Sequence, residues 1–164
     1  MALRIENNLI TLIIMMKKIY TILCMGLAMI MCSCEPDADQ DFDDQTFKGT
    51  VSVDYKDATY DNNDIIVEVE EASEGLLEIT IHSIKFVPQM PVTIDVTFPN
   101  VPYTKSKDNI TFFIDTVVPT MGPTPVEKYT SKSLAGLITS KGGISFTVQI
   151  ADYPTRYIGT RIDD

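Results

Sequence analysis

The chain has no tryptophan and a single histidine, His82, and its three cysteines all lie within the first 34 residues. The remainder therefore cannot form a disulfide framework, a cysteine zinc site or a thiol nucleophile. One imidazole cannot build a multi-histidine metal site, and no Gly-x-Ser-x-Gly turn is present to support a triad with Ser83 or Ser145. We predict no catalytic residue, no metal site and no cofactor, and we interpret His82 as a partly exposed strand residue.

Basic residues are scarce, because 13 lysines and arginines stand against 23 acidic residues, for a net charge of −10. A strongly anionic protein repels phosphate backbones, so nucleic acid is excluded as a partner. A glycosidase-like pair would need two carboxyl groups about 5 to 10 Å apart, one of them with a raised pKa. Most acids here alternate with apolar residues or lie in turns, so we interpret them as solvated. Asp54, Asp57, Asp61 and Asp64 match no calcium loop and are interpreted in the same way.

An apolar run over residues 19–31 follows Lys17 and Lys18. A basic start followed by an apolar run of about 7 to 15 residues is typical of a secretory signal peptide, whereas a membrane-spanning helix needs about 20 residues. Small Ser33 precedes Cys34. We predict that residues 1–33 are a lipoprotein signal peptide with its true start at Met16, cleaved before a lipidated Cys34 that attaches the protein to a membrane. The alternative is an ordinary secretory leader with incidental cysteines.

An acidic segment follows, with six acids and no base over residues 35–44. Such self-repelling composition is typical of a solvated linker, so residues 34–45 are predicted to be a lipidated acidic tether. An EF-hand is rejected, because Phe42 stands where the loop needs glycine and Lys48 where it needs a bidentate glutamate.

Apolar and polar residues alternate from Phe47 onward, the period that places alternate side chains on one face of a strand. No segment in this part shows a sustained helical period. Turn residues such as 61–64, 74–75, 99–100 and 141–143 separate the alternating segments. The predicted strands cover residues 47–55, 64–71, 76–87, 92–98, 110–116, 133–139, 143–151 and 157–162.

Many short strands with regular turns are typical of a sandwich or a barrel, and a meander of eight can close into a cylinder. The alternation changes phase near His82 and Ser83, where Ile81 and Ile84 are both apolar, and this predicts a bulge that bends the strand. We therefore predict an all-β domain over residues 46–164, an eight-stranded antiparallel up-and-down barrel. Its interior is either filled or holds one small ligand.

Five segments, taken in order, resemble the calycin-like β-barrel lipoproteins of Bacteroides and its relatives. They are FKGTVSV at 47–53, LEITIHSIKF at 77–86, MPVTIDVTFPNVP at 90–102, LAGLI at 134–138 and ISFTV at 144–148. The resemblance implies a calycin- or lipocalin-like barrel on the outer membrane, in a family whose activity is largely undefined. The acidic residues that follow Cys34 also resemble a signal for export of such lipoproteins to the cell surface. A location in the periplasm remains the alternative. The Gly-x-Trp signature of true lipocalins is absent, so no lipocalin ligand is carried over.

Candidate site residues are few. Tyr103, Tyr129, Tyr153 and Tyr157 fall near predicted strand ends or loops, where a ring can stack on a sugar or line an apolar ligand. Ordinary packing with a wet hydroxyl is the alternative. Thr116 lies in Asp115-Thr116-Val117, which resembles the O-glycosylation motif of exported Bacteroidetes proteins.

Two functions remain open at this stage. The first is a non-catalytic binding module for a small or extended ligand, either a glycan or a lipid-like molecule. The second is an accessory lipoprotein that docks onto an outer-membrane protein complex, with a filled barrel and no ligand. An open internal cavity would favour the first, and a filled interior with exposed apolar surface would favour the second.

Overall fold

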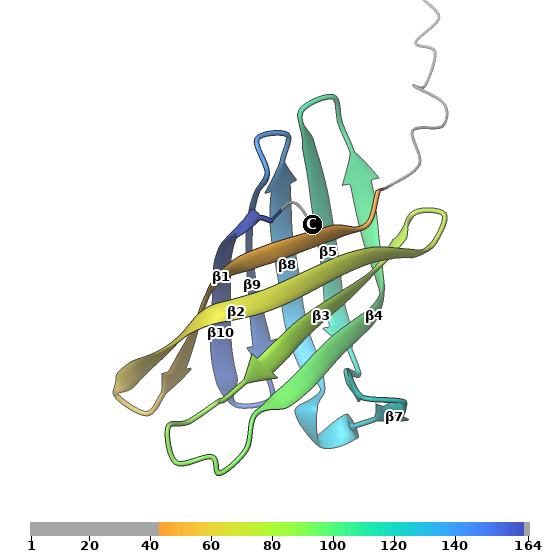
Figure 1. Ribbon diagram of the computed structural model, residues 1–164. Helices are drawn as coiled ribbons and strands as arrows, with labels where there is room; N and C mark the ends of the chain where they lie inside the picture. Colours follow the sequence, from red (N-terminus) through yellow and green to blue (C-terminus); the bar gives the residue numbers. More distant parts are fainter. Residues whose placement is uncertain (1–42, 163–164) are drawn as a thin grey trace, which may run out of the picture. The chain divides into compact units, whose positions relative to one another are not determined.

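The computed structural model describes residues 43–162, which form a closed antiparallel β-barrel (Figure 1). Each long strand pairs with the next along the chain, and the last pairs with the first, so the predicted eight-stranded up-and-down barrel is confirmed. The long strands are β1 (Gln45–Tyr55), β2 (Ala58–Ser73), β3 (Leu76–Ile84), β4 (Ile94–Lys105), β5 (Asn109–Val117), β8 (Ser131–Thr139), β9 (Gly143–Ile150) and β10 (Tyr153–Arg161). In Figure 1, β1 to β4 form the front wall, and β5 and β8 to β10 form the back wall.

A small hairpin and a short helix connect β5 to β8, in a part of the chain where no strand was predicted. The hairpin consists of β6 (Thr120–Met121) and β7 (Thr124–Pro125), turns at Gly122 with φ of 59°, and precedes the 3-10 helix Glu127–Tyr129. Thr120 pairs with Thr97 of β4, which ties the hairpin to the barrel wall. The segment lies beside the lower end of the barrel in Figure 1.

Five shifts in strand register bend the wall of the described barrel, and four of them contain a residue other than glycine at positive φ. These residues are Asp64 (φ 60°), Ser83 (φ 56°), Asn100 (φ 55°) and Ser133 (φ 52°), each at a shift in strand register. A bulge places two residues of one strand opposite one residue of its partner and increases the local twist. The bulge predicted at His82 and Ser83 is confirmed, since both oppose Asp95 alone.

Two predicted turns lie inside strands. Residues 61–64 belong to β2, which begins at Ala58, and residues 99–100 belong to β4, which continues to Lys105. Asn and Asp tolerate the left-handed conformation in a bulge as well as in a turn, so their presence did not mark a chain reversal. The turns predicted at 74–75 and 141–143 do separate consecutive strands.

Inward-facing side chains fill the barrel. The largest that are fully buried include Tyr157, Phe47, Phe86, Phe98 and Leu77. Ring centroids of Phe146 and Tyr157 lie 5.3 Å apart, and Phe146 also contacts Phe112 at 6.2 Å. Gly136 makes room for the Phe112 ring, because a Cβ at that position would overlap it. The interior of the described barrel is therefore a packed apolar core.

Candidate functional site

Tyr129 and Tyr153 are the two predicted tyrosines that the structure brings together. Their rings stack on the buried ring of Phe86, with centroid separations of 5.5 Å and 4.9 Å. Tyr55, which was not among the predicted site residues, adds a ring contact to Tyr153 with centroids 5.7 Å apart. These residues come from the end of β1, the segment after β3, the 3-10 helix and the start of β10. The rings pack against one another and cover one end of the core.

Tyr103 lies apart from this cluster, near the end of β4. Its hydroxyl donates a hydrogen bond to Oε1 of Glu71 at 2.6 Å. Burial, together with the bond to Glu71 and the charges of Glu71 and Glu74, raises the pKa of Tyr103 to about 12. The phenol therefore stays neutral and acts as a structural donor that links β4 to β2.

Tyr157 does not lie near a strand end as predicted. It sits inside β10, and its side chain is fully buried in the core. Its hydroxyl donates to the backbone oxygen of Ile65 at 3.3 Å, and burial raises its pKa well above the ordinary value. Tyr157 is a core residue because Thr155, Tyr157 and Gly159 form the inward-facing set of this strand.

The two remaining predicted sites are Thr116 and Cys34. Thr116 is exposed one residue before the end of β5, opposite Lys132 of β8, so its hydroxyl is accessible, and its glycosylation stays a prediction. Cys34, the signal peptide and most of the tether lie outside the described residues. Among residues 43–162, no helix has the length and apolar character that a membrane span requires.

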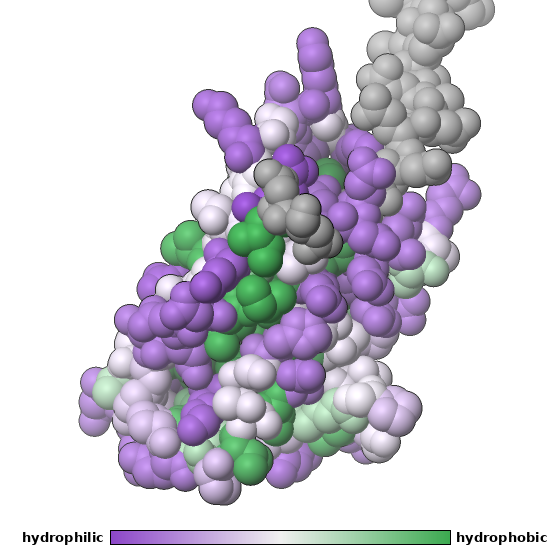
Figure 2. All heavy atoms as spheres, in the orientation of Figure 1, coloured by the Kyte–Doolittle hydropathy of each residue, from purple (hydrophilic) through white to green (hydrophobic). Residues whose placement is uncertain are grey.

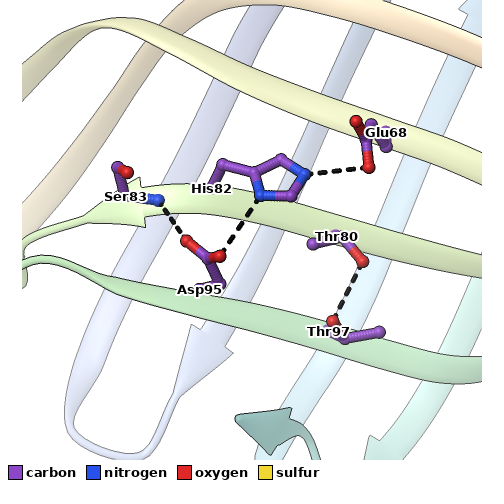
Figure 3. Close-up of polar contacts among 6 residues, drawn as sticks. All are labelled: Glu68, Thr80, His82, Ser83, Asp95 and Thr97. Carbon is purple, nitrogen blue, oxygen red and sulfur yellow. Dashed lines mark hydrogen bonds and ion pairs between the residues drawn. The ribbon is translucent and has the colours of Figure 1, made fainter. Parts of the chain in front are cut away.

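A polar cluster that the sequence did not reveal surrounds His82 on the outer wall (Figure 3). Nε2 of His82 lies 2.9 Å from Oε2 of Glu68 on β2, and Nδ1 lies 3.4 Å from Oδ2 of Asp95 on β4. The Nε2 atom is buried, and its contact with Glu68 is an ion pair without the alignment of a good hydrogen bond. The backbone N–H of Ser83 donates to the other Asp95 oxygen at 2.8 Å. Asp95 therefore holds the bulge of β3.

The environment of His82 favours its charged form. Burial is the strongest single influence and opposes the charge, but the contacts and charges of Glu68 and Asp95 together raise the pKa of His82 above 6.5. The cluster binds three neighbouring strands together. In the described part of the chain, no group of three His, Cys, Asp or Glu side chains is arranged to hold a metal ion.

Two hollows lie on the outside of the barrel wall. The larger, of about 300 Å³, crosses β1, β8, β9 and β10, and its polar lining includes Ser52, Asp54, Ser133, Thr147, Gln149 and Arg156. We call it the Arg156 groove. The smaller, of about 200 Å³, lies where β4 and β5 part, beside Tyr103 and Phe113. Neither hollow was predicted, because each depends on strand register and on bulges.

Comparisons of the chain with protein-family models, with curated proteins and with solved structures find no match. Membership of the calycin-like lipoproteins therefore stays a prediction from the segments quoted above. The fold itself establishes a β-barrel domain compatible with a binding or a structural role.

Proposed function

We propose that this protein is an envelope lipoprotein, acylated at Cys34, whose barrel is a non-catalytic docking module that acts through its outer wall. The observation that carries the proposal is the packed interior, together with the position of both hollows on the outside of the wall. Of the two functions left open by the sequence, this is the accessory one, in which a protein complex of the outer membrane is the partner.

The interior offers little support for a ligand held inside the barrel. Small-molecule sites are cavities of about 300 to 1,000 Å³ that enclose most of the ligand. Here the inward-facing side chains pack against one another in one core, and Tyr129 and Tyr153 stack on Phe86 at one end of the barrel. A ligand could enter only by displacing aromatic rings from their contacts, which would give up their buried area.

The outer wall carries apolar side chains suited to a protein partner. Phe113 on β5 is 54% exposed, and Ile158 on β10 is 60% exposed. Both face outward on the back wall, separated by β8 and β9. Figure 2 shows hydrophilic residues over much of the opposite, front wall, with apolar residues along its middle. Aromatic side chains are enriched at the cores of protein interfaces, so the exposed ring of Phe113 supports a protein partner on this wall.

Site-specific photo-crosslinking in intact cells tests the docking surface. A photoreactive phenylalanine analogue is placed at Phe113 or at Ile158 of the full-length protein, and at exposed Glu70 on β2 as the control. We expect one discrete adduct with an envelope protein from positions 113 and 158 and none from position 70. Equal labelling at all three positions, or no adduct at 113 and 158, would contradict docking through this wall.

The anchor is tested independently by Cys34→Ala. We expect the substitution to abolish incorporation of labelled fatty acid and to move the protein from the membrane to the soluble fraction, because acyl chains supply the membrane affinity. A Cys32→Ala protein is the matched control and should remain acylated. Persistent membrane fractionation of Cys34→Ala would count against the proposed anchor.

A further inference from the structure

The Arg156 groove is opened by the bulge in β8. Lys132 pairs with Gln149 and Ala135 pairs with Thr147, so Ser133 and Leu134 together oppose Val148 alone. Ser133 adopts a φ of 52°, a conformation that residues other than glycine rarely take. Bulges re-aim side chains, and backbone strain of this kind occurs preferentially at binding sites. Here the bulge places Ser133 in the lining of the groove.

Polar groups in the groove are left without partners. Arg156 is exposed and forms no ion pair with any carboxylate of residues 43–162, although Asp54 lines the same groove. Within that range, the hydroxyls of Ser133 and Thr147 also have no hydrogen-bond partner. Lys132, paired with Gln149 beside the groove, adds a second cation without an ion pair to a described carboxylate. The chain is anionic overall, so one such cation in the lining of the groove and a second beside it are a local exception.

These groups define the chemistry of an occupant. The planar guanidinium of Arg156 suits a carboxylate, which it can bind through two parallel hydrogen bonds. Ser133 and Thr147 offer neutral donors and acceptors for hydroxyls, and Gln149 adds an acceptor oxygen, since its amide nitrogen already donates to the backbone oxygen of Ala151 at 2.8 Å. The exposed ring of Pro154 supplies apolar surface for C–H groups. Asp54 already accepts a hydrogen bond from Thr59 at 2.6 Å and would repel a doubly charged phosphate, but it can accept another from a ligand hydroxyl.

We propose that the Arg156 groove binds one acidic sugar residue of a glycan, that is, a hydroxylated ring bearing a single carboxylate. Its volume of about 300 Å³ is at the low end for small-molecule sites and fits one ring, and its exposed lining leaves room for the rest of a chain. The proposal rests on the proposed function only in using the outer wall, and it does not require the protein partner at Phe113 and Ile158.

Titration of the purified full-length lipoprotein in detergent with D-glucuronate, D-glucose and glucose 6-phosphate tests the proposal by calorimetry. We expect weak saturable binding of glucuronate, with glucose and glucose 6-phosphate at least about tenfold weaker, because loss of a charge-assisted hydrogen bond costs that much or more. Arg156→Gln should weaken glucuronate binding about ten- to a hundredfold. Lys107→Gln, the same charge change at an exposed turn outside the groove, should leave it unchanged.

The variant Ser133→Gly tests the groove without disturbing the fold. Glycine adopts the positive φ of this position readily, and the substitution removes only the hydroxyl group. We expect this variant to fold and to bind glucuronate several-fold more weakly. Equal binding of glucose and glucuronate, stronger binding of the phosphate, or equal effects of Arg156→Gln and Lys107→Gln would overturn the proposal. Absent glucuronate binding with intact crosslinks at positions 113 and 158 would reject the groove alone. The reverse result would reject only the docking function.

Discussion

Nε2 of His82 lies 2.9 Å from Oε2 of Glu68, so the one histidine of the chain joins β3 to β2 on the outer wall (Figure 3). Its other ring nitrogen faces Asp95 of β4 at 3.4 Å. Only the doubly protonated imidazolium carries a hydrogen on both nitrogens, so this geometry suits the charged form. The raised pKa of His82 is consistent with that, despite the opposing influence of burial.

The first prediction concerns pH and the variant His82→Gln. Because the folded pKa lies above the unfolded value of 6.5, the histidine's contribution to stability is fully present below pH 6.5 and is lost as pH rises through the folded pKa. The difference in unfolding free energy between wild type and His82→Gln should therefore be larger at pH 5.5 than at pH 8.5. We expect the pH-dependent part to stay below about 1 kcal/mol, since all three groups are partly exposed.

Urea unfolding at both pH values, with an NMR titration of the imidazole, checks this prediction. Lys85→Gln, a neighbouring change on the same side of the barrel, controls for the loss of one positive charge. A folded-state pKa below 6.5, or a stability difference that grows with pH, would contradict the ion-pair account.

The second prediction concerns Tyr103, whose pKa is raised to about 12 by burial and by its hydrogen bond to Glu71. The difference in phenolate absorbance between wild type and Tyr103→Phe should develop near pH 12. In Glu71→Gln the same titration should shift to lower pH, because the bond and the negative charge that disfavour the phenolate are weakened. An unshifted titration in Glu71→Gln would show that Glu71 contributes nothing to the raised pKa.

The third prediction concerns Gly136, where a Cβ would overlap the ring of Phe112 and the Cβ of Phe146. Overpacking of a tight core costs about 1 to 3 kcal/mol, and we expect Gly136→Ala to lower the unfolding free energy by that amount. Gly143→Ala is the matched control, because the new Cβ would meet only the Thr139 hydroxyl at 3.2 Å. Equal losses in chemical unfolding of the two variants would mean that the Phe112 ring moves aside freely.

The fourth prediction tests the aromatic cluster. Phe86→Ala removes the ring on which Tyr129 and Tyr153 stack and should cost about 3 to 5 kcal/mol of unfolding free energy. The vacated space should also let an apolar dye bind to the folded variant, whereas wild type binds none. Phe113→Ala, which removes an exposed ring, should have a much smaller effect on unfolding. Saturable dye binding to the wild-type protein would reveal an open interior and would also count against docking as its function.

Alternation of side chains was sufficient to predict every long strand of the described barrel, because each strand buries one face. It could not place the bulges at Asp64 and Asn100, because the same residue types suit a turn and a bulge, and strand register decides between them. The strand β10 shows a second difficulty. Its outward-facing residues include apolar Ile158, and its inward-facing residues include polar Thr155. Because the two faces of the strand differ little in polarity, Tyr157 was predicted near a strand end although it lies inside the strand.

The polar sites could not be predicted because they join residues far apart in the chain. Glu68, His82 and Asp95 lie on three strands and meet only when the bulge of β3 fixes their relative positions. The Arg156 groove likewise needs the exact register between β1 and β10 and the bulge at Ser133, which no local pattern reveals. The partial exposure of His82 itself, by contrast, could be predicted, because the residue lies on the polar face of its strand.

The pairing of Phe47 through Val53 with Arg161 through Thr155 also bears on how the molecule assembles. During synthesis, β1 emerges first, but it can pair with β10 only after β10 has left the ribosome. Until then, β1 and β9 present bare edges that can recruit other chains, and long-separation contacts of this kind slow folding. A chain stopped just before Tyr153 keeps seven of the eight long strands and should therefore accumulate as an open, aggregation-prone sheet instead of a smaller stable protein.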